Sequence, residues 1–287
     1  MYSIKELRKQ QYDYHKEKFP FLFDFKRNPY SFLKAPFYME TSALLVWLLL
    51  KTKIKPNTVT IYYGLAGIVT GILLSIPNNY TIFVALLIAF TKGILDWSDG
   101  HLARITGQTS LTGHILDIYG AHLNSLGLQI GLGLYVAVNS GTLVFYYLVP
   151  LLLFFRIANL YVFTQTIMFD EIAHRYDPSS LSNIIESNKK LLDDIPNSRS
   201  NIYFKIKKLF LGFLDDRARS VDFICLIILL ELLYSFNIIW VIFLLILIKH
   251  FIIFIISLYK VSKGGWVENI LNKKLVELYT LFQNTKS

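Results

Sequence analysis

The sequence predicts an all-α, polytopic membrane protein, in which six transmembrane helices form a bundle and an N-terminal helix lies at the membrane interface. Composition gives the first reason, because 54% of the 287 residues are hydrophobic and the mean hydropathy is +0.45. These values are too apolar for an ordinary soluble domain of this length. The second reason is that the apolar residues gather into long runs separated by short loops.

Six of these runs are long enough to cross a bilayer, which takes roughly 17 to 25 apolar residues in a helix. They lie near 58–76, 81–103, 114–137, 142–168, 221–236 and 238–262. The fifth run is short, so we expect its helix to be tilted or to extend into its flanks. Residues 41–50 are too few to cross and are followed by Lys51, Lys53 and Lys55, so we predict an interfacial helix there.

Charge predicts the orientation of the bundle in the membrane. The loops at 77–80, 138–141 and 234–237 contain no charged residue. The opposite side carries the basic N-terminus, the lysine-bearing tail, Arg104 and the segment 169–220. Positive charge gathers on the cytoplasmic side of membrane proteins, so we place both termini there. The net charge of +9 then indicates anionic headgroups or phosphate substrates rather than nucleic acid, for which no sequence module is present.

The polar and apolar stretches divide the chain into five segments. These are a cytoplasmic N-terminal segment with the interfacial helix (1–56), the first four transmembrane helices (57–168), a cytoplasmic insert (169–220), the last two transmembrane helices (221–262) and a cytoplasmic tail (263–287). The single cysteine, Cys225, lies in an apolar run, so the sequence offers neither a disulfide framework nor a thiolate metal site.

Three carboxylates lie at the ends of two of these apolar helices. Asp96 and Asp99 are three residues apart and share a helix face, and Asp117 lies near the start of the next helix. Small residues that leave room on the same faces are Gly100, Ala103 and Gly113. Two neighbouring helices would bring the carboxylates together near the cytoplasmic boundary. Oxygen ligands of this kind suit Mg²⁺ or Mn²⁺, with substrate phosphates completing the coordination shell.

A plainer interpretation of these acids is also open. Asp117 lies in the first turn of its helix, where the helix dipole favours a carboxylate, and an acid at a membrane edge is often a helix-end group in water. Charged residues within membrane helices usually serve a function, however. Three acids on matching faces, with glycine and alanine between them, therefore favour a binding site.

The spacing of the residues around the acids is specific. It reads Asp96-x2-Asp99-Gly100-x2-Ala103-Arg104-x8-Gly113-x3-Asp117, and Pro56, Asn57 and Thr60 stand at the start of the first span. Both features resemble the CDP-alcohol phosphotransferase (CDP-alcohol phosphatidyltransferase) family, over roughly 57–262 of the chain. The resemblance implies an integral-membrane transferase that moves a phosphoryl-alcohol group from a CDP-alcohol to an alcohol acceptor and releases CMP, in phospholipid or related phosphodiester synthesis.

The resemblance also implies roles for individual residues. Asp96, Asp99 and Asp117 would bind the divalent metal ion, Mg²⁺ or Mn²⁺. The residues implied in CDP binding are Asn57, Asp96, Asp99, Gly100, Ala103, Arg104 and Gly113. The implied partners are a CDP-activated alcohol donor and an alcohol acceptor, one of them a lipid, together with membrane lipids. A homodimer is left open.

The family's pattern continues with a fourth aspartate, and this chain has Ala121 in that place. The resemblance implies that the missing acid would act as general base and help to hold a second metal ion. His122 points away from this stripe, because a helix turns by about 100° per residue. His114 shares the face of Asp117 and is the substitute base that we name, although it is equally an ordinary residue of a helix start.

Three explanations of Ala121 are compatible with the sequence. The chain is an inactivated enzyme, a natural enzyme that works slowly or with another base, or a non-catalytic membrane protein that binds or transports CDP compounds. Removal of a general base usually lowers a rate by about 10²- to 10⁴-fold and leaves binding intact. The sequence therefore indicates what the site binds more directly than whether it turns over.

Arginines further along the chain are candidates for the acceptor site. Arg156 lies about 15–20 Å from the cytoplasmic end of its helix, by the rise per residue of an α-helix. Arg217 and Arg219 stand just before the fifth span, at the cytoplasmic surface. Each candidate has a structural alternative, because Arg156 would also pair well with Glu231 and the other two would also anchor the helix to lipid headgroups.

Overall fold

The computed structural model of the chain describes residues 2–26, 28–160, 218–234, 236–263 and 265–266. These residues form α-helices and one short 3-10 helix, with no strand among them, which confirms the all-α prediction. Two units are present, Met1–Val149 with Gly212–Phe243, and Pro150–Leu211 with Leu244–Ser287. The elements that build the candidate site all belong to the first unit.

The first helix, α1 (Ile4–Lys18), begins at a capping box. The Ser3 hydroxyl accepts a hydrogen bond from the backbone N–H of Glu6, and the Glu6 carboxylate accepts one from the backbone N–H of Ser3. The bond from the Ser3 N–H, together with one of 2.9 Å that the Ser3 hydroxyl donates to the same carboxylate, lowers the pKa of Glu6 below its usual value. The chain then passes through a 3-10 helix, η1 (Pro20–Phe23), to α2 (Pro29–Leu49), which begins with a proline, as helices often do.

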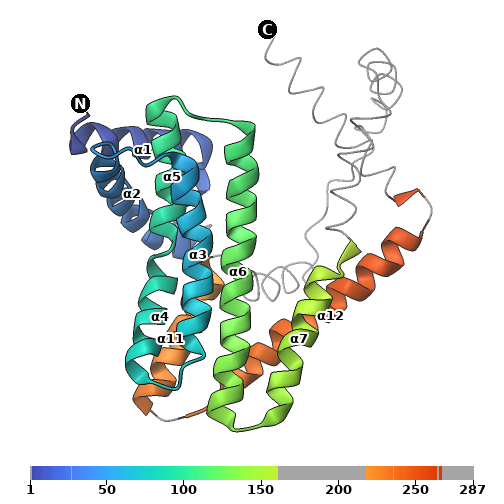
Figure 1. Ribbon diagram of the computed structural model, residues 1–287. Helices are drawn as coiled ribbons and strands as arrows, with labels where there is room; N and C mark the ends of the chain where they lie inside the picture. Colours follow the sequence, from blue (N-terminus) through green and yellow to red (C-terminus); the bar gives the residue numbers. More distant parts are fainter. Residues whose placement is uncertain (1, 27, 161–217, 235, 264, 267–287) are drawn as a thin grey trace. The chain divides into compact units, whose positions relative to one another are not determined.

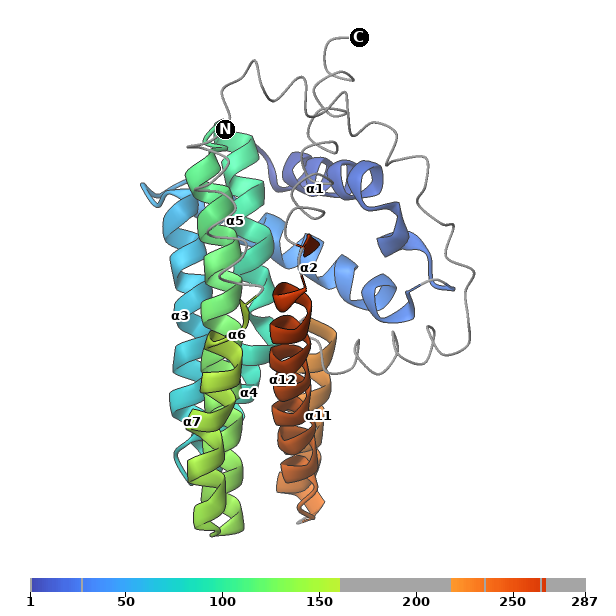
Figure 2. The same ribbon diagram turned by 90° about the vertical axis from the view of Figure 1, so that its right-hand side faces the viewer.

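Four helices form the bundle that holds the site: α3 (Pro56–Leu74), α4 (Asn79–Thr91), α5 (Gly93–Thr106) and α6 (Leu111–Ser140). α3 and α6 lie side by side in both views (Figures 1 and 2). Glycines permit the close approach, because a Cβ on Gly67 would lie 2.6 Å from the carbonyl carbon of Asn124. A Cβ on Gly127 would likewise lie 2.5 Å from the Gly67 carbonyl oxygen. The glycines of the third predicted span therefore serve helix packing.

The second predicted span consists of α4 and α5, with a break at Lys92 that was not predicted. Lys92 is buried, and its Nζ donates a hydrogen bond of 2.7 Å to the side-chain oxygen of Asn124 on α6. The Asn124 amide nitrogen donates in turn to the Tyr63 carbonyl of α3. A buried ammonium requires such partners. This connection fixes the start of α5, one turn before Asp96, against both α3 and α6.

The α2 helix is longer than the interfacial helix predicted at 41–50, so those bounds were wrong. Lys34 and Pro36 interrupt the apolar pattern before residue 41, but the helix accommodates both. The Lys34 ammonium lies 2.7 Å from the Asp222 carboxylate in a buried ion pair, which compensates the charge. Figure 2 shows α1 and α2 running across the direction of α3 and α6. The interfacial position itself stays a prediction.

The remaining described helices are α7 (Leu143–Ile157), α11 (Ala218–Tyr234) and α12 (Ile239–Ser262), at the fourth, fifth and sixth predicted spans. Within the first unit, the Glu231 carboxylate accepts hydrogen bonds from the backbone N–H groups of Ile238 and Ile239. Glu231 therefore caps the start of α12, which is a favourable place for a negative charge. The remainder of the fourth predicted span, 161–168, lies outside the described residues.

Five of the described stretches are long and apolar enough to cross a membrane: Pro29–Leu49, Pro56–Leu74, Asn79–Thr106, Thr112–Ser140 and Ile239–Ser262. The chain is therefore a multi-pass membrane protein, as predicted, whereas the count of six crossings stays a prediction. Among shorter helices, α7 is apolar but has only 15 residues. Most of the predicted insert at 169–220 and of the tail at 263–287 lies outside the described residues.

Candidate active site

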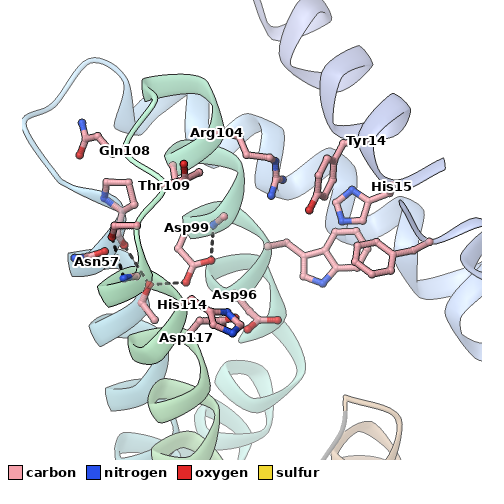
Figure 3. A pocket seen from close by; sticks show the side chains of 18 residues that line it. Tyr14, His15, Asn57, Asp96, Asp99, Arg104, Gln108, Thr109, His114 and Asp117 are labelled. Carbon is pink, nitrogen blue, oxygen red and sulfur yellow. Dashed lines mark hydrogen bonds between the residues drawn. The ribbon is translucent and has the colours of Figure 1, made fainter. Parts of the chain in front are cut away.

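A cavity of about 550 Å³ lies at one end of the bundle, where α1 meets α3, α5 and α6 (Figure 3). The three acids singled out in the sequence, Asp96, Asp99 and Asp117, line this cavity from α5 and α6. It is also lined by the other residues with an implied role in CDP binding, Asn57, Gly100, Ala103, Arg104 and Gly113. The fold therefore brings all residues with an implied role in metal or CDP binding into one cavity.

Asp99 is the most firmly held of the three acids. One carboxylate oxygen accepts a hydrogen bond of 2.6 Å from the Thr60 hydroxyl of α3, and the other accepts one of 2.5 Å from the backbone N–H of Gly100. Both Asp99 and Thr60 are buried. The bond joins α3 to α5, so the threonine near the start of the first span orients the second acid of the motif.

Asp96 and Asp117 are more open to solvent than Asp99, Asp96 being half-buried and Asp117 exposed. In the described part of the chain, no three His, Cys, Asp or Glu side chains are grouped closely enough to hold a metal ion together. The donor set is nevertheless all oxygen, which suits Mg²⁺. Mg²⁺ usually takes only one or two carboxylates and completes its shell with water and substrate phosphates. The residues thus fit a metal that is bound jointly with a phosphate ligand.

The opposite wall is formed by the start of α3 and the start of α6. Ser110 is the N-cap of α6, and its hydroxyl accepts a hydrogen bond of 3.0 Å from the backbone N–H of Gly113. A Cβ on Gly113 would lie 3.3 Å from the side-chain oxygen of Asn57. Glycine at this position therefore lets the Asn57 amide approach α6 at the rim of the cavity.

Arg104 projects from α5 towards α1, as Figure 3 shows. Its Nη2 donates a hydrogen bond of 3.0 Å to the side-chain oxygen of Gln11, and its guanidinium lies 3.8 Å from the centre of the Tyr14 ring. A Cβ on Gly100 would lie 3.2 Å from Nη1, so the guanidinium occupies the space that this glycine leaves. The cation is thus held between its own helix and α1.

Three of the cavity residues that were missed in the sequence precede the motif. Tyr14 and His15 come from α1, and Phe19 follows directly after it. The His15 ring stacks on Trp97 of α5, with centroids 4.3 Å apart and ring planes inclined by 3°. A faint signal was available, because the buried residues of α1 are Leu7, Gln11 and His15, spaced four apart on one face.

His15 lies outside the membrane-spanning helices and has a perturbed pKa. Burial lowers the pKa of the imidazole below its usual value, and the positive charge of Arg104 lowers it further. The hydrogen bond from Nδ1 to the Gln11 carbonyl, 2.8 Å long, acts in the opposite direction. His15 is therefore neutral at pH 7, which suits its stacked position on Trp97.

Position 121 lies outside the residues that line the cavity, whereas His114 on the same helix lies among them. His114 lines the cavity, next to Asp117 on α6. Ala121 and His122 are exposed on the same helix and do not line the cavity. Position 121 therefore contributes no polar group to the site. A role for His114 as the base in place of the missing acid stays a proposal.

The three arginines predicted for the acceptor site are not brought together in the cavity by the described part of the structure. Arg219 is exposed near the start of α11 and is not among the residues that line the cavity. Arg156 belongs to α7, in the second unit. Arg217 lies outside the described residues. An acceptor role for any of the three stays a prediction.

Comparison with known sequences gives a family match for the part of the chain that carries the motif. Residues 53–176 match the sequence model of the CDP-alcohol phosphatidyltransferases, which confirms the resemblance stated above. The match includes α3, α5 and α6, and hence all three acids, but it begins after α1 and α2. No curated protein matches the chain.

Proposed function

We propose that the protein transfers a phosphoryl-alcohol group from a CDP-alcohol to an alcohol acceptor and releases CMP. The premise is that residues 53–176 match the sequence model of the CDP-alcohol phosphatidyltransferase family. Transferases of this family act in phospholipid synthesis. The proposal for this chain rests on one observation, which is that the cavity gathers the three acids of the motif with Arg104 and Asn57.

The charges of the cavity support a metal–diphosphate ligand. Asp96, Asp99 and Asp117 carry three formal negative charges, and Arg104 carries one positive charge, which leaves two negative charges uncompensated. We propose that Asp96, Asp117 and the free lone pairs of Asp99 hold Mg²⁺, or Mn²⁺, in this place. When bound, the ion would neutralise charge on the phosphates of the donor. Arg104 supplies a second cation for the same diphosphate.

The reaction itself requires little from the protein beyond alignment. The acceptor hydroxyl attacks the phosphorus that carries the donor's alcohol, the bond from that phosphorus to the CMP oxygen breaks, and the hydroxyl proton is lost. Ala121 cannot accept that proton. His114 is the imidazole that lines the cavity from the same helix, and we assign it the role of proton acceptor.

Ala121 also favours a second candidate function, which is a membrane protein that binds CDP compounds without chemistry. The residues with an implied role in metal and CDP binding all line the cavity, and the acid expected at position 121 is absent. Such a protein would bind CDP with Mg²⁺ and release no CMP from a CDP-alcohol.

Two measurements on the purified full chain in lipid nanodiscs separate these functions. The first is the Mg²⁺-dependent binding of CDP, and the second is the release of CMP from a CDP-linked lipid or a CDP-linked water-soluble alcohol, each with an alcohol acceptor. We expect both binding and CMP release. Binding without CMP supports the second function. Absence of Mg²⁺-dependent CDP binding, or wild-type binding by Asp96→Asn, contradicts both.

We also propose that the cavity faces the cytoplasm. Lys51, Lys53 and Lys55 precede α3 and stand next to Pro56, which lines the cavity. The loop at the other end of α3, around 75–78, carries no charge. Positive charge at the cavity end supports the cytoplasmic side for that end.

A further inference from the structure

We infer that α1, which precedes the part of the chain that matches the family, is a component of the substrate site. In this inference Gln11 and Tyr14 are positioning residues that hold the Arg104 guanidinium towards the diphosphate of the donor. The inference rests on the proposed function for the identity of that ligand. It assigns a task to a helix that was not predicted to belong to the site.

The Arg104 guanidinium is held by uncharged groups of α1. Arg104 contacts α1 at two points, the Gln11 side-chain oxygen at 3.0 Å and the Tyr14 ring at 3.8 Å. Both partners are uncharged, and within the described residues Arg104 forms no ion pair. The cation is therefore fixed in geometry, and within the described residues no carboxylate lies close enough to form an ion pair with it. A fixed, unpaired guanidinium in a cavity is suited to a phosphate, whose oxygens accept its parallel N–H groups.

Contacts along α1 fix the position of this helix. Gln11 is fully buried, and its amide nitrogen donates a hydrogen bond of 3.1 Å to the Ser42 hydroxyl of α2. One turn earlier, Leu7 is fully buried in an apolar cluster with residues of α2, α3 and α5. One turn later, His15 stacks on Trp97. Contacts in three successive turns leave α1 little freedom to slide, so the two groups that it offers to Arg104 are pre-organised.

The contact between Tyr14 and Arg104 is exposed to the cavity. Tyr14 and Arg104 both line it, together with His15 and Phe19. A helix that served only to cover apolar surface would make its contacts beneath the cavity wall. Here the side chain that packs on the cation is itself part of the wall, so any ligand that meets Arg104 also lies close to α1.

Gly100 provides an independent indication that the Arg104 side chain extends towards α1. Arg104 lies one turn after Gly100, and its side chain runs back over that glycine, where a Cβ would come within 3.2 Å of Nη1. The guanidinium therefore reaches α1 along the cavity edge of α5. The same glycine also donates its N–H to Asp99, so the cation and the acid are positioned around one residue.

The test compares CDP binding with Mg²⁺ in the full chain and in variants of Tyr14. Tyr14→Leu removes the ring beneath the guanidinium, and we expect CDP affinity to fall about tenfold, within the range given by loss of a partly buried cation–π contact. Tyr14→Phe keeps the ring and removes only the hydroxyl, which also interacts with Arg104, so its affinity should stay within about twofold of wild type. Tyr12→Leu is the matched control, because Tyr12 lies on the exposed side of α1, against Phe23, and should bind CDP as wild type does.

A double-mutant cycle separates positioning from simple packing. In an Arg104→Gln background, Tyr14→Leu should cause no further loss of CDP affinity, because the residue that it positions is gone. Additive losses would overturn the inference, since they would show that Tyr14 acts independently of Arg104. Gln11→Met keeps the volume of the side chain and removes the hydrogen bond to Arg104, so it provides a second variant with the same expected tenfold loss if Tyr14→Leu fails to fold.

The outcomes distinguish this inference from the proposed function. If wild type binds CDP with Mg²⁺, and both Tyr14→Leu and Gln11→Met bind it equally well, α1 is no part of the site while the proposed function stands. If wild type does not bind CDP at all, the proposed function is wrong and the inference falls with it. Selective loss in these two variants, with melting temperatures close to that of wild type, supports the inference.

Discussion

The hydroxyl of Thr60 donates a hydrogen bond of 2.6 Å to the carboxylate of Asp99, across 39 positions of the sequence. Both residues are buried, one on α3 and one on α5. The bond uses a lone pair on one carboxylate oxygen, and the Gly100 N–H uses one on the other. Asp99 is thereby oriented before any ligand arrives, and it retains lone pairs for a metal ion or for water.

The first prediction concerns Thr60→Val, which keeps the shape of the side chain but removes the hydrogen bond to Asp99. A buried carboxylate oxygen then lacks its partner, and we expect a loss of about 1–3 kcal/mol in the free energy of unfolding. Mg²⁺-dependent CDP binding should weaken as well, because the carboxylate is no longer oriented. Thr60→Ser keeps the hydroxyl and serves as control. Equal behaviour of the two variants in denaturation and in binding titrations would show that the bond is unimportant.

The sequence predicted that the three acids would lie close together, because their spacing is local. Asp96 and Asp99 share a turn, and the helix period alone places them on one face, so no tertiary knowledge was needed. The same argument predicted that Asp117 would join them, since short loops make consecutive helices neighbours. The role of Thr60 required the structure, because its partner lies on another helix.

The contribution of α1 was missed for a different physical reason. Its buried face carries Gln11 and His15, which are polar and so conceal the amphipathic pattern. Their burial is favourable only because Ser42 and Trp97 provide a hydrogen bond and a stacking partner, and those residues come from distant parts of the sequence. The start of α2 was misjudged similarly, because Lys34 is acceptable in an apolar helix only with Asp222 beside it.

The second prediction concerns Gly100→Ala. The added Cβ meets the tip of a long side chain, Arg104, rather than backbone, so the fold should tolerate it with little change in melting temperature. The guanidinium must shift, however, and we expect CDP affinity to fall about tenfold from the lost charge-assisted contact. Gly67→Ala is an informative contrast, because its Cβ meets the Asn124 backbone and should destabilise the α3–α6 packing instead. Unchanged CDP binding by Gly100→Ala would mean that Arg104 does not contact the ligand.

The third prediction concerns position 121. Ala121→Asp supplies a carboxylate four residues after Asp117, on the same helix face. If general-base catalysis limits turnover, CMP release should accelerate by about 10²- to 10⁴-fold. Ala121→Asn adds a side chain of the same size without a base and should leave the rate near that of wild type. His114→Ala should lower the residual rate of the wild-type protein, and an unchanged rate would remove His114 from the mechanism.

The fourth prediction concerns the side of the membrane that the cavity faces. In a Cys225→Ala background, cysteine is introduced either at Gln108, which is exposed at the cavity, or at Asn79, which is exposed at the other end of the bundle. A membrane-impermeant maleimide applied to intact cells should label Asn79→Cys and leave Gln108→Cys unlabelled until the cells are opened. The reverse pattern would place the cavity outside the cytoplasm and contradict the positive-inside assignment.

The last prediction concerns the pH dependence of the α1 contact. Burial and the nearby charge of Arg104 lower the pKa of His15 in the folded protein, whereas the unfolded chain has a pKa of about 6.5. The unfolded state therefore takes up the proton first as pH falls, so the stability from neutral His15 is fully present above about pH 6.5 and is lost below it. We expect the melting temperature to fall between pH 7.5 and 5 in wild type, and to fall less in His15→Phe, which keeps an aromatic ring against Trp97 but does not titrate. Identical pH profiles for the two proteins would show that His15 is not the group that senses the proton.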